Sequence, residues 1–226
     1  MPWFFNRLTN TDLPEFWEAY RQKMQQSYTY NTPIEKVRFV VFDTETTGLN
    51  VKKDHLLSIG AVSIQNFQLT VKDSFECFVQ QSYQSNGESI RVHGILPVMK
   101  SHQMDEWQAV AAFTEFLSNG VLVGHHVGFD IGMVNKVLKT KIKQKLWNKK
   151  IDTLDMAIRL SPSADNNQRE SLGLDHLCQK YQIPVSDRHT SAGDALITGI
   201  LFMKLLARLQ DRGIKTLGQL LHKPMF

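Results

Sequence analysis

The stretch from Arg38 to Asn50, RFVVFDTETTGLN, constrains the fold of this chain more than any other. Residues 39–42 are β-branched or aromatic, which is typical of a strand buried on both faces. The run leads into Asp43 and Glu45, whose side chains should project from the same face because they are two residues apart in a strand. Carboxylates this close repel each other, and a bound Mg²⁺ or Mn²⁺ would relieve that repulsion. The alternative is a strand followed by a polar turn with solvated acids.

Length and composition fit one packed domain, or one domain with an extension. The chain has 226 residues, 42% of them hydrophobic, and a net charge of +4 that suits a polyanionic partner. Its two cysteines, Cys77 and Cys178, form no CxxC pair and are expected to be reduced core thiols. No apolar run reaches the roughly 18 residues of a membrane span. We therefore expect a soluble, cytoplasmic protein with no membrane partner.

The hydrophobic pattern predicts an α/β fold in which strands come first and then alternate with helices. Strands are predicted at 39–42, 56–65, 74–80, 121–123 and 150–153, and helices at 107–117, 131–147, 151–160, 174–181 and 192–211. The first three strands should form an antiparallel meander with a turn at Gln65 and Asn66. We divide the chain into a helical extension (1–34), a main domain (35–212) and a short C-terminal helix or tail (213–226).

The N-terminal extension contains an amphipathic helix. Its apolar face is formed by Leu13, Phe16, Trp17, Tyr20 and Met24. This face either packs on the main domain or binds a partner or a second copy.

Three further polar residues lie near predicted helix starts. Asp130 ends the segment VLVGHHVGFD, and His189 and Asp194 lie in HTSAGDALIT. Taken singly, either aspartate could cap a helix and the histidine could be a solvated loop residue.

Taken in order, FDTETTG, GHHVGFD and H-x4-D resemble the motifs of the DEDDh exonucleases. This family includes the DnaQ-like proofreading epsilon subunit of bacterial DNA polymerase III, ribonuclease T and oligoribonuclease. The resemblance extends from about Val37 to Leu209. Thr190 stands four residues before Asp194 and no tyrosine is nearby, which favours the histidine form of the family. The resemblance implies a ribonuclease H-like fold, with a mixed five-stranded sheet flanked by helices.

The resemblance also implies a role for each motif residue. Asp43, Glu45, Asp130 and Asp194 match the four metal-binding acids of two Mg²⁺ or Mn²⁺ ions, and His189 matches the general base. Two divalent cations can relieve the negative charge of a phosphodiester during its hydrolysis, and histidine can accept the proton of the attacking water.

Substrate contacts follow from the same resemblance. Thr46, Gly48 and Leu49 match the segment that holds the terminal nucleotide and its 3′-hydroxyl. Glu88 and His93, in ESIRVHGI, match a second such segment, although His93 could be an ordinary turn residue.

Other positions near the motifs are given structural roles. Phe129 is expected in the core, and His125 is expected to order the site. His126 replaces the asparagine that is usual in the family, and Asp152 is given no catalytic role.

Seven lysines fall within fifteen residues: Lys136, Lys139, Lys141, Lys143, Lys145, Lys149 and Lys150. They form either a solvated surface or a patch that contacts phosphates, in which case binding would weaken steeply with salt.

The resemblance implies a metal-dependent 3′→5′ exonuclease that acts on single-stranded ends, DNA being favoured, and releases nucleoside 5′-monophosphates. A polymerase or repair complex is a possible partner. The alternatives are an RNA-trimming enzyme of the same family and a non-catalytic nucleic-acid-binding module.

Overall fold

The structure, a computed structural model, describes residues 13–80, 103–161 and 172–222. Its strands are β1 (Phe39–Thr46), β2 (Leu56–Gln65), β3 (Gln68–Val79), β4 (Gln103–Met104), β5 (Val121–Gly124) and β6 (Lys150–Asp152). Its helices are α1 (Glu15–Met24), η1 (Ile34–Lys36), α3 (Glu106–Leu117), α4 (Gly128–Ile142), α5 (Thr153–Leu160), α6 (Leu174–Lys180), α7 (Ser191–Asp211) and α8 (Leu217–Leu221).

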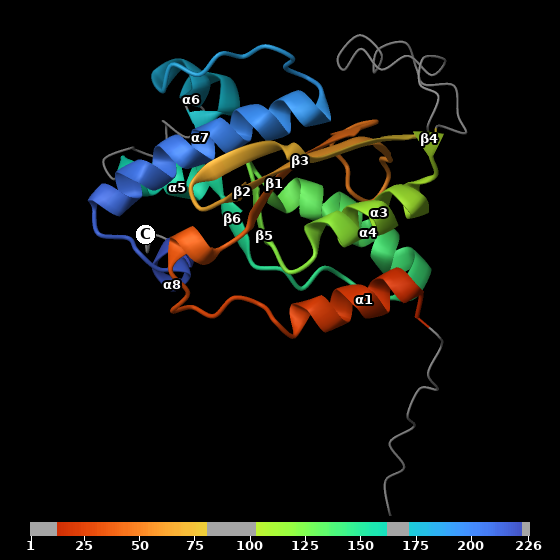
Figure 1. Ribbon diagram of the computed structural model, residues 1–226. Coiled ribbons are helices and arrows are strands. Elements are labelled where there is room, and N and C mark those ends of the chain that lie inside the picture. Colours follow the sequence, from red (N-terminus) through yellow and green to blue (C-terminus); the bar gives the residue numbers. More distant parts are fainter. Residues whose placement is uncertain (1–12, 81–102, 162–171, 223–226) are drawn as a thin grey trace, which may run out of the picture.

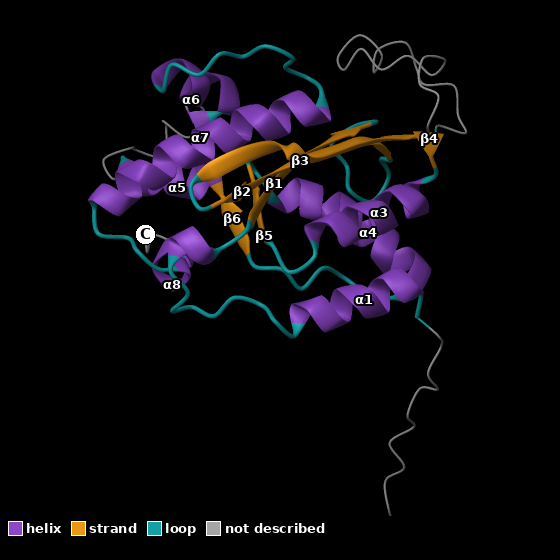
Figure 2. Cartoon of the chain, viewed as in Figure 1, coloured by secondary structure: helices purple, strands orange, loops and turns teal. Residues whose placement is uncertain are grey.

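The six strands described form one mixed sheet in the order β4-β3-β2-β1-β5-β6, with helices on both faces (Figures 1 and 2). The predicted α/β fold is confirmed, with the short strand β4 added at the edge beside β3. β1, β2 and β3 form the predicted antiparallel meander, and β1, β5 and β6 are parallel.

The β2–β3 hairpin differs from the prediction in the length of its second strand. Asn66 and Phe67 form the turn, both with positive φ, and β3 begins at Gln68 rather than at Ser74. The first part of β3 is largely exposed, and its pairing with β2 is interrupted by a register shift between Val62 and Ser63. Leu69 and Val71 alternate with polar residues here, but Asp73 interrupts this alternation before it resumes at Phe75 and Cys77.

β1 divides its side chains between two cores. Phe39 faces α7, where its ring lies 4.9 Å from that of Phe202. Val40 and Phe42 face α3 and α4, and the Phe42 ring stacks 5.0 Å from that of Phe113. Because side chains alternate along a strand, Asp43 and Glu45 continue the α7 face and Thr44 continues the α4 face.

The apolar face of α1 packs against the rest of the chain. Trp17 and Tyr20 are buried, at 0% and 2% exposure. The Tyr20 hydroxyl donates to Asn148 Oδ1 (2.6 Å) and accepts from the backbone N–H of Trp147 (2.7 Å). The packing interpretation is therefore confirmed for this face, and Figure 1 shows α1 beneath α3 and α4.

α4 ends at Ile142, so the prediction of a helix up to Trp147 was wrong. Lys143 adopts a left-handed conformation and stops the helix. Leu146 is nevertheless buried, and its backbone N–H donates to Asn135 Oδ1 (2.8 Å). The apolar spacing therefore continues past the helix end. None of the helices in the described residues is long and apolar enough to span a membrane.

Candidate active site

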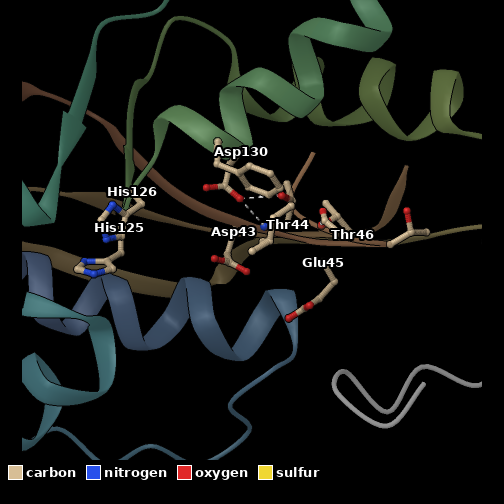
Figure 3. Close-up of a pocket in the computed structure, with 11 residues that line it drawn as sticks. Asp43, Thr44, Glu45, Thr46, His125, His126 and Asp130 are labelled. Atoms are coloured by element: carbon tan, nitrogen blue, oxygen red, sulfur yellow. Dashed lines mark hydrogen bonds between the residues drawn. The ribbon is translucent and has the colours of Figure 1, made fainter. Parts of the chain in front are cut away.

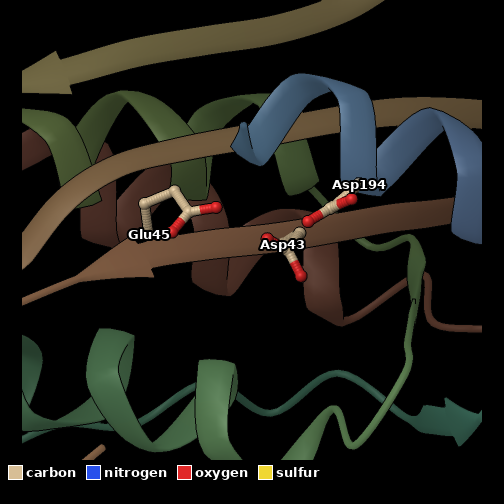
Figure 4. A group of neighbouring side chains, drawn as sticks. All are labelled: Asp43, Glu45 and Asp194. Carbon is tan, nitrogen blue, oxygen red and sulfur yellow. The ribbon is translucent and has the colours of Figure 1, made fainter. Parts of the chain in front are cut away.

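Three carboxylates meet where β1 ends beside the start of α7. Asp43 and Glu45 come from β1 and Asp194 from the first turn of α7, and one oxygen of each lies within 4.8 Å of the others (Figure 4). Thr190 caps α7, because its hydroxyl accepts from the backbone N–H of Gly193 (3.1 Å). Asp194 is thus not the cap, and its carboxylate faces the other two acids.

Gly60 allows α7 to reach this position. It pairs with Asp43 across β1 and β2. A Cβ on Gly60 would lie 2.3 Å from the backbone of Ser191 and Ala192, closer than real atoms approach. The absence of a side chain lets the start of α7 rest directly on the sheet, which brings Asp194 to Asp43.

Asp130 reaches the same region from the opposite face of the sheet. It lies in the first turn of α4, whose N-cap is Val127, so Asp130 does not cap the helix. Its Oδ1 accepts from the backbone N–H (3.0 Å) and the hydroxyl (2.6 Å) of Thr44 (Figure 3). Asp130 is outside the group of three within 4.8 Å, although it lines one cavity with Asp43 and Glu45.

The acids are held where they are hard to ionise together. Burial raises the pKa of Asp43 well above its ordinary value, and the charges of Asp130, Asp194 and Glu45 raise it further. Burial and the charge of Asp194 raise the pKa of Glu45 to about 7. Burial also raises the pKa of Asp130 to about 7, against the hydrogen bonds from Thr44. A divalent cation would relieve this repulsion, and a donor set made of oxygen alone suits Mg²⁺ or Mn²⁺.

The His189 side chain belongs neither to the group of three acids nor to the cavity wall. This side chain is exposed, and the φ of His189 is +63°. Its contact with the acids is made by the backbone N–H, which donates to Asp194 Oδ2 (3.3 Å).

Arg188 is a site residue that sequence reasoning missed. Its Nη1 donates to Asp194 Oδ1, and its Nε donates to Asp175 Oδ1 (2.7 Å). It belongs to none of the motif positions, so only its place beside His189 could have drawn attention to it.

A cavity of about 740 Å³ adjoins the acids. It is lined by Asp43, Thr44, Glu45, Thr46, Thr47, Gly48, Leu49, His125, His126, Phe129 and Asp130. The predicted contacts Thr46, Gly48 and Leu49 all lie on it, and Leu49 is 88% exposed. Phe129 packs partly against the core, as expected, and also forms part of the wall. Glu88 and His93 lie outside the described residues.

The two adjacent histidines have structural contacts. His125 Nδ1 lies 2.9 Å from the Thr153 hydroxyl, and burial together with the nearby His126 lowers the pKa of His125 to about 4. The backbone N–H of His126 donates to Asp152 Oδ1 (3.0 Å), and the same oxygen caps α5. These contacts join β5, β6 and α5. His125 and His126 themselves line the cavity (Figure 3).

The lysine-rich segment extends along α4 and beyond it, whereas Asp130 stands at the start of this helix. Lys136 donates from Nζ to the Asp54 carbonyl (2.5 Å), and Lys149 lies over the Tyr30 ring at 5.6 Å. Lys139, Lys141, Lys143, Lys145 and Lys150 are exposed. Exposed lysines are compatible both with a solvated surface and with a patch that contacts phosphates.

The sequence matches the model of the RNase_T exonuclease family over residues 40–202, a range that contains all five motif residues. The chain belongs to the RNase_T exonuclease family. The resemblance to the DEDDh exonucleases drawn from the three motifs is therefore confirmed.

Relatives of this exonuclease-family chain are much longer proteins. It is 30% identical over 183 residues to the PolC-type DNA polymerase III of Bacillus subtilis, an alignment that covers 80% of the chain and 12% of the polymerase. It is 32% identical over 199 residues to the DNA polymerase III subunit epsilon-like protein of Rhodobacter capsulatus, covering 87% of the chain and 27% of that protein.

Solved structures of exonuclease I share the fold. One has a TM-score of 0.65 at 20% identity and covers 78% of this chain and 43% of its own. A complex of the Escherichia coli enzyme with a dT13 oligonucleotide also has a TM-score of 0.65, at 19% identity, with the same coverage.

Proposed function

We propose that this chain is a metal-dependent 3′→5′ exonuclease that removes nucleotides from single-stranded ends and releases nucleoside 5′-monophosphates. The observation that supports this most is the convergence of Asp43, Glu45 and Asp194 within 4.8 Å of one another, beside a cavity that also contains Asp130. A member of an exonuclease family that kept the fold but not the chemistry would have no reason to hold these repelling acids together.

In this proposal Asp43, Glu45 and Asp194 hold one divalent cation, and Asp43 with Asp130 holds a second. Mg²⁺ or Mn²⁺ in these positions would offset the negative charge that develops on the phosphate during hydrolysis. The Thr44 hydrogen bonds keep the Asp130 carboxylate oriented from the opposite face of β1.

His189 takes the proton of the attacking water. Its side chain is exposed, so the segment from Ser186 to Thr190 has to carry it to the cavity when substrate binds. Catalytic groups on loops often reach their working position only in the substrate complex.

Thr46, Gly48 and Leu49 receive the terminal nucleotide. Leu49 and Phe129 offer apolar surface to the base of this nucleotide. Thr46 lines the same cavity, and its hydroxyl donates to the Gly48 carbonyl (2.7 Å). Glu88 and His93 are proposed contacts of the same nucleotide.

DNA is the favoured substrate because the relatives are DNA polymerase III proteins and the similar solved structures include a complex with a DNA oligonucleotide. We also propose a proofreading or repair role with a DNA polymerase or repair complex, and a place in the cytoplasm. We assign the exonuclease activity to residues 35–212, with 1–34 and 213–226 as its extensions.

The test uses oligonucleotides labelled at the 3′ or the 5′ end, as DNA and as RNA, with Mg²⁺, Mn²⁺ or EDTA. Wild type should release labelled mononucleotide from the 3′ end of DNA with either metal and none with EDTA. His189→Ala should lower the rate by about 10²–10⁴-fold and keep its affinity for Mn²⁺, since its contact with Asp194 is made by the backbone.

Faster hydrolysis of RNA would replace the DNA preference with an RNA-trimming role. Binding of oligonucleotides without any hydrolysis would support a non-catalytic module. Hydrolysis that persists in Asp43→Ala would remove the acids from the mechanism.

A further inference from the structure

Both oxygens of Asp194 are occupied by the segment that carries His189. Oδ1 accepts from the Arg188 guanidinium and Oδ2 from the His189 backbone N–H (3.3 Å). The carboxylate is 8% exposed and the Arg188 side chain 19%, so this pair is shielded from solvent on most sides. Such shielded pairs are more strongly coupled than pairs on an open surface.

Arg188 is anchored at a second point. Its Nε donates to Asp175 Oδ1 (2.7 Å) at the start of α6, so the guanidinium bridges α6 and α7. The backbone nearby is tightly packed, because a Cβ on Gly193 would lie 2.1 Å from the Asp187 carbonyl oxygen. The segment before α7 is therefore held against the helix by side-chain and backbone contacts.

The guanidinium supplies positive charge where the carboxylates are crowded. Its charge lowers the pKa of both Asp43 and Glu45, in opposition to burial and to the neighbouring acids. The Arg188 guanidinium is bonded to Asp194 Oδ1, an oxygen that a metal ion held by the three acids could also bind.

A divalent cation held by Asp43, Glu45 and Asp194 would sit close to Arg188. Like charges a few ångströms apart in a shielded site repel each other strongly. The Arg188 Nη1 donor and the cation would also compete for Asp194 Oδ1.

We propose that Arg188 is an internal counter-cation of this site: it neutralises Asp194 while no metal ion is bound and is displaced when one binds. The inference rests on the proposed function. His189 is the next residue, so displacement of Arg188 removes one of the contacts that hold the segment carrying the general base. Metal loading and the placement of His189 are thereby coupled, and Arg188 acts as a positioning residue.

The direct test is the affinity for Mn²⁺, measured from the free-ion signal by electron paramagnetic resonance without nucleic acid. Arg188→Ala should bind Mn²⁺ about tenfold more tightly than wild type, which corresponds to about 1.4 kcal/mol. Arg188→Lys keeps the charge but loses the fork, and it should lie between the two. Arg212→Ala is the matched control, since Arg212 donates to the Arg159 and Leu160 carbonyls at the far end of α7, and its affinity should not change.

A second measurement follows the wild-type protein throughout, and a variant is needed only to assign one resonance. The Nε–H resonance of Arg188, assigned by its loss in Arg188→Lys, should move during a Ca²⁺ titration with the same midpoint as cation binding.

An Arg188 resonance that stays in place at saturation would overturn the inference. So would a folded Arg188→Ala variant that binds Mn²⁺ no more tightly than wild type. Either result, in a wild type that still hydrolyses oligonucleotides, leaves the proposed function standing; a wild type that binds no Mn²⁺ removes both.

Discussion

One oxygen of Asp130 accepts hydrogen bonds from both the backbone N–H and the hydroxyl of Thr44. Thr44 lies between Asp43 and Glu45 on β1 but faces the α4 side of the sheet. The middle residue of the D-T-E segment therefore connects the acid delivered by α4 to the acids that face α7.

Replacing Thr44 with valine removes the hydroxyl donor and keeps the shape of the side chain. The Asp130 carboxylate then keeps only the backbone N–H, and we expect a loss of about 1–2 kcal/mol in the free energy of unfolding. The rate of 3′-end hydrolysis should fall about tenfold. Thr44→Ser retains the hydroxyl and should stay close to wild type in both measurements. Equal rates for the valine and serine variants would show that this hydrogen bond does not orient Asp130.

Replacing Gly60 with alanine should push α7 away from the sheet, because its Cβ would lie 2.3 Å from the helix backbone. We expect destabilisation of about 1–3 kcal/mol by chemical denaturation and a weaker affinity for Mn²⁺. Gly128→Ala is the matched control, since nothing lies within 4 Å of the added Cβ. A Gly60→Ala variant with the Mn²⁺ affinity of wild type would contradict the role given to this contact.

Removing one of the crowded charges should stabilise the metal-free protein. In EDTA at pH 8, Asp43→Asn removes a carboxylate whose pKa is raised by burial and by three neighbouring acids. The thermal midpoint should rise by a few degrees, which corresponds to about 1–2 kcal/mol for a domain of this size. The same variant should lose Mn²⁺ binding and at least about 10³-fold in hydrolysis, since an amide is a poorer ligand for a hard cation. Asp211→Asn, at the exposed end of α7, is the control for a general charge effect.

The stability of the metal-free protein should fall as pH rises. The pKa of Glu45 is raised from 4.5 to about 7 and that of Asp130 from 3.8 to about 7, so the folded state binds protons that the unfolded state releases. The stabilisation by the protonated carboxyls is complete below the unfolded values and is lost as pH rises through about 7.

Thermal unfolding in EDTA at several values from about pH 5 to pH 8 measures this trend. Glu45→Gln should flatten the fall, and saturating Mn²⁺ should oppose it because the cation favours the ionised acids. A profile in EDTA that is the same in wild type and in Glu45→Gln would exclude Glu45 as a cause.

Sequence patterns predicted the strands and helices whose apolar residues form a continuous run or a regular period. β1 and β5 were identified from continuous apolar runs, and α7 from a long apolar periodicity. The predicted ends of elements were less accurate. β3 starts earlier than predicted because Gln68, Leu69 and Thr70 also pair with β2, and α4 stops earlier because Lys143 turns left-handed. Neither the earlier start of β3 nor the earlier end of α4 is marked by a clear change of composition in the sequence.

The acids could be predicted because their motifs sit at strand and helix ends that the fold brings together. The contacts between those ends could not. Gly60 and Thr44 matter through residues far away in the chain, and Arg188 through a pairing with Asp175 and Asp194 that spacing does not suggest. His189 has a positive φ and contacts Asp194 through its backbone N–H, and a motif match alone does not give that geometry.

The alternation of side chains along β1 determines how the two halves of the site are spaced. Groups carried by α7 and groups carried by α4 meet across the width of a single strand, with Asp43 on one side and Thr44 on the other. Their separation is therefore fixed by the backbone and not by any loop. A shift of α7 or α4 against the sheet would therefore change the spacing of the acids, and Gly60 and Thr44 are the contacts that oppose such a shift.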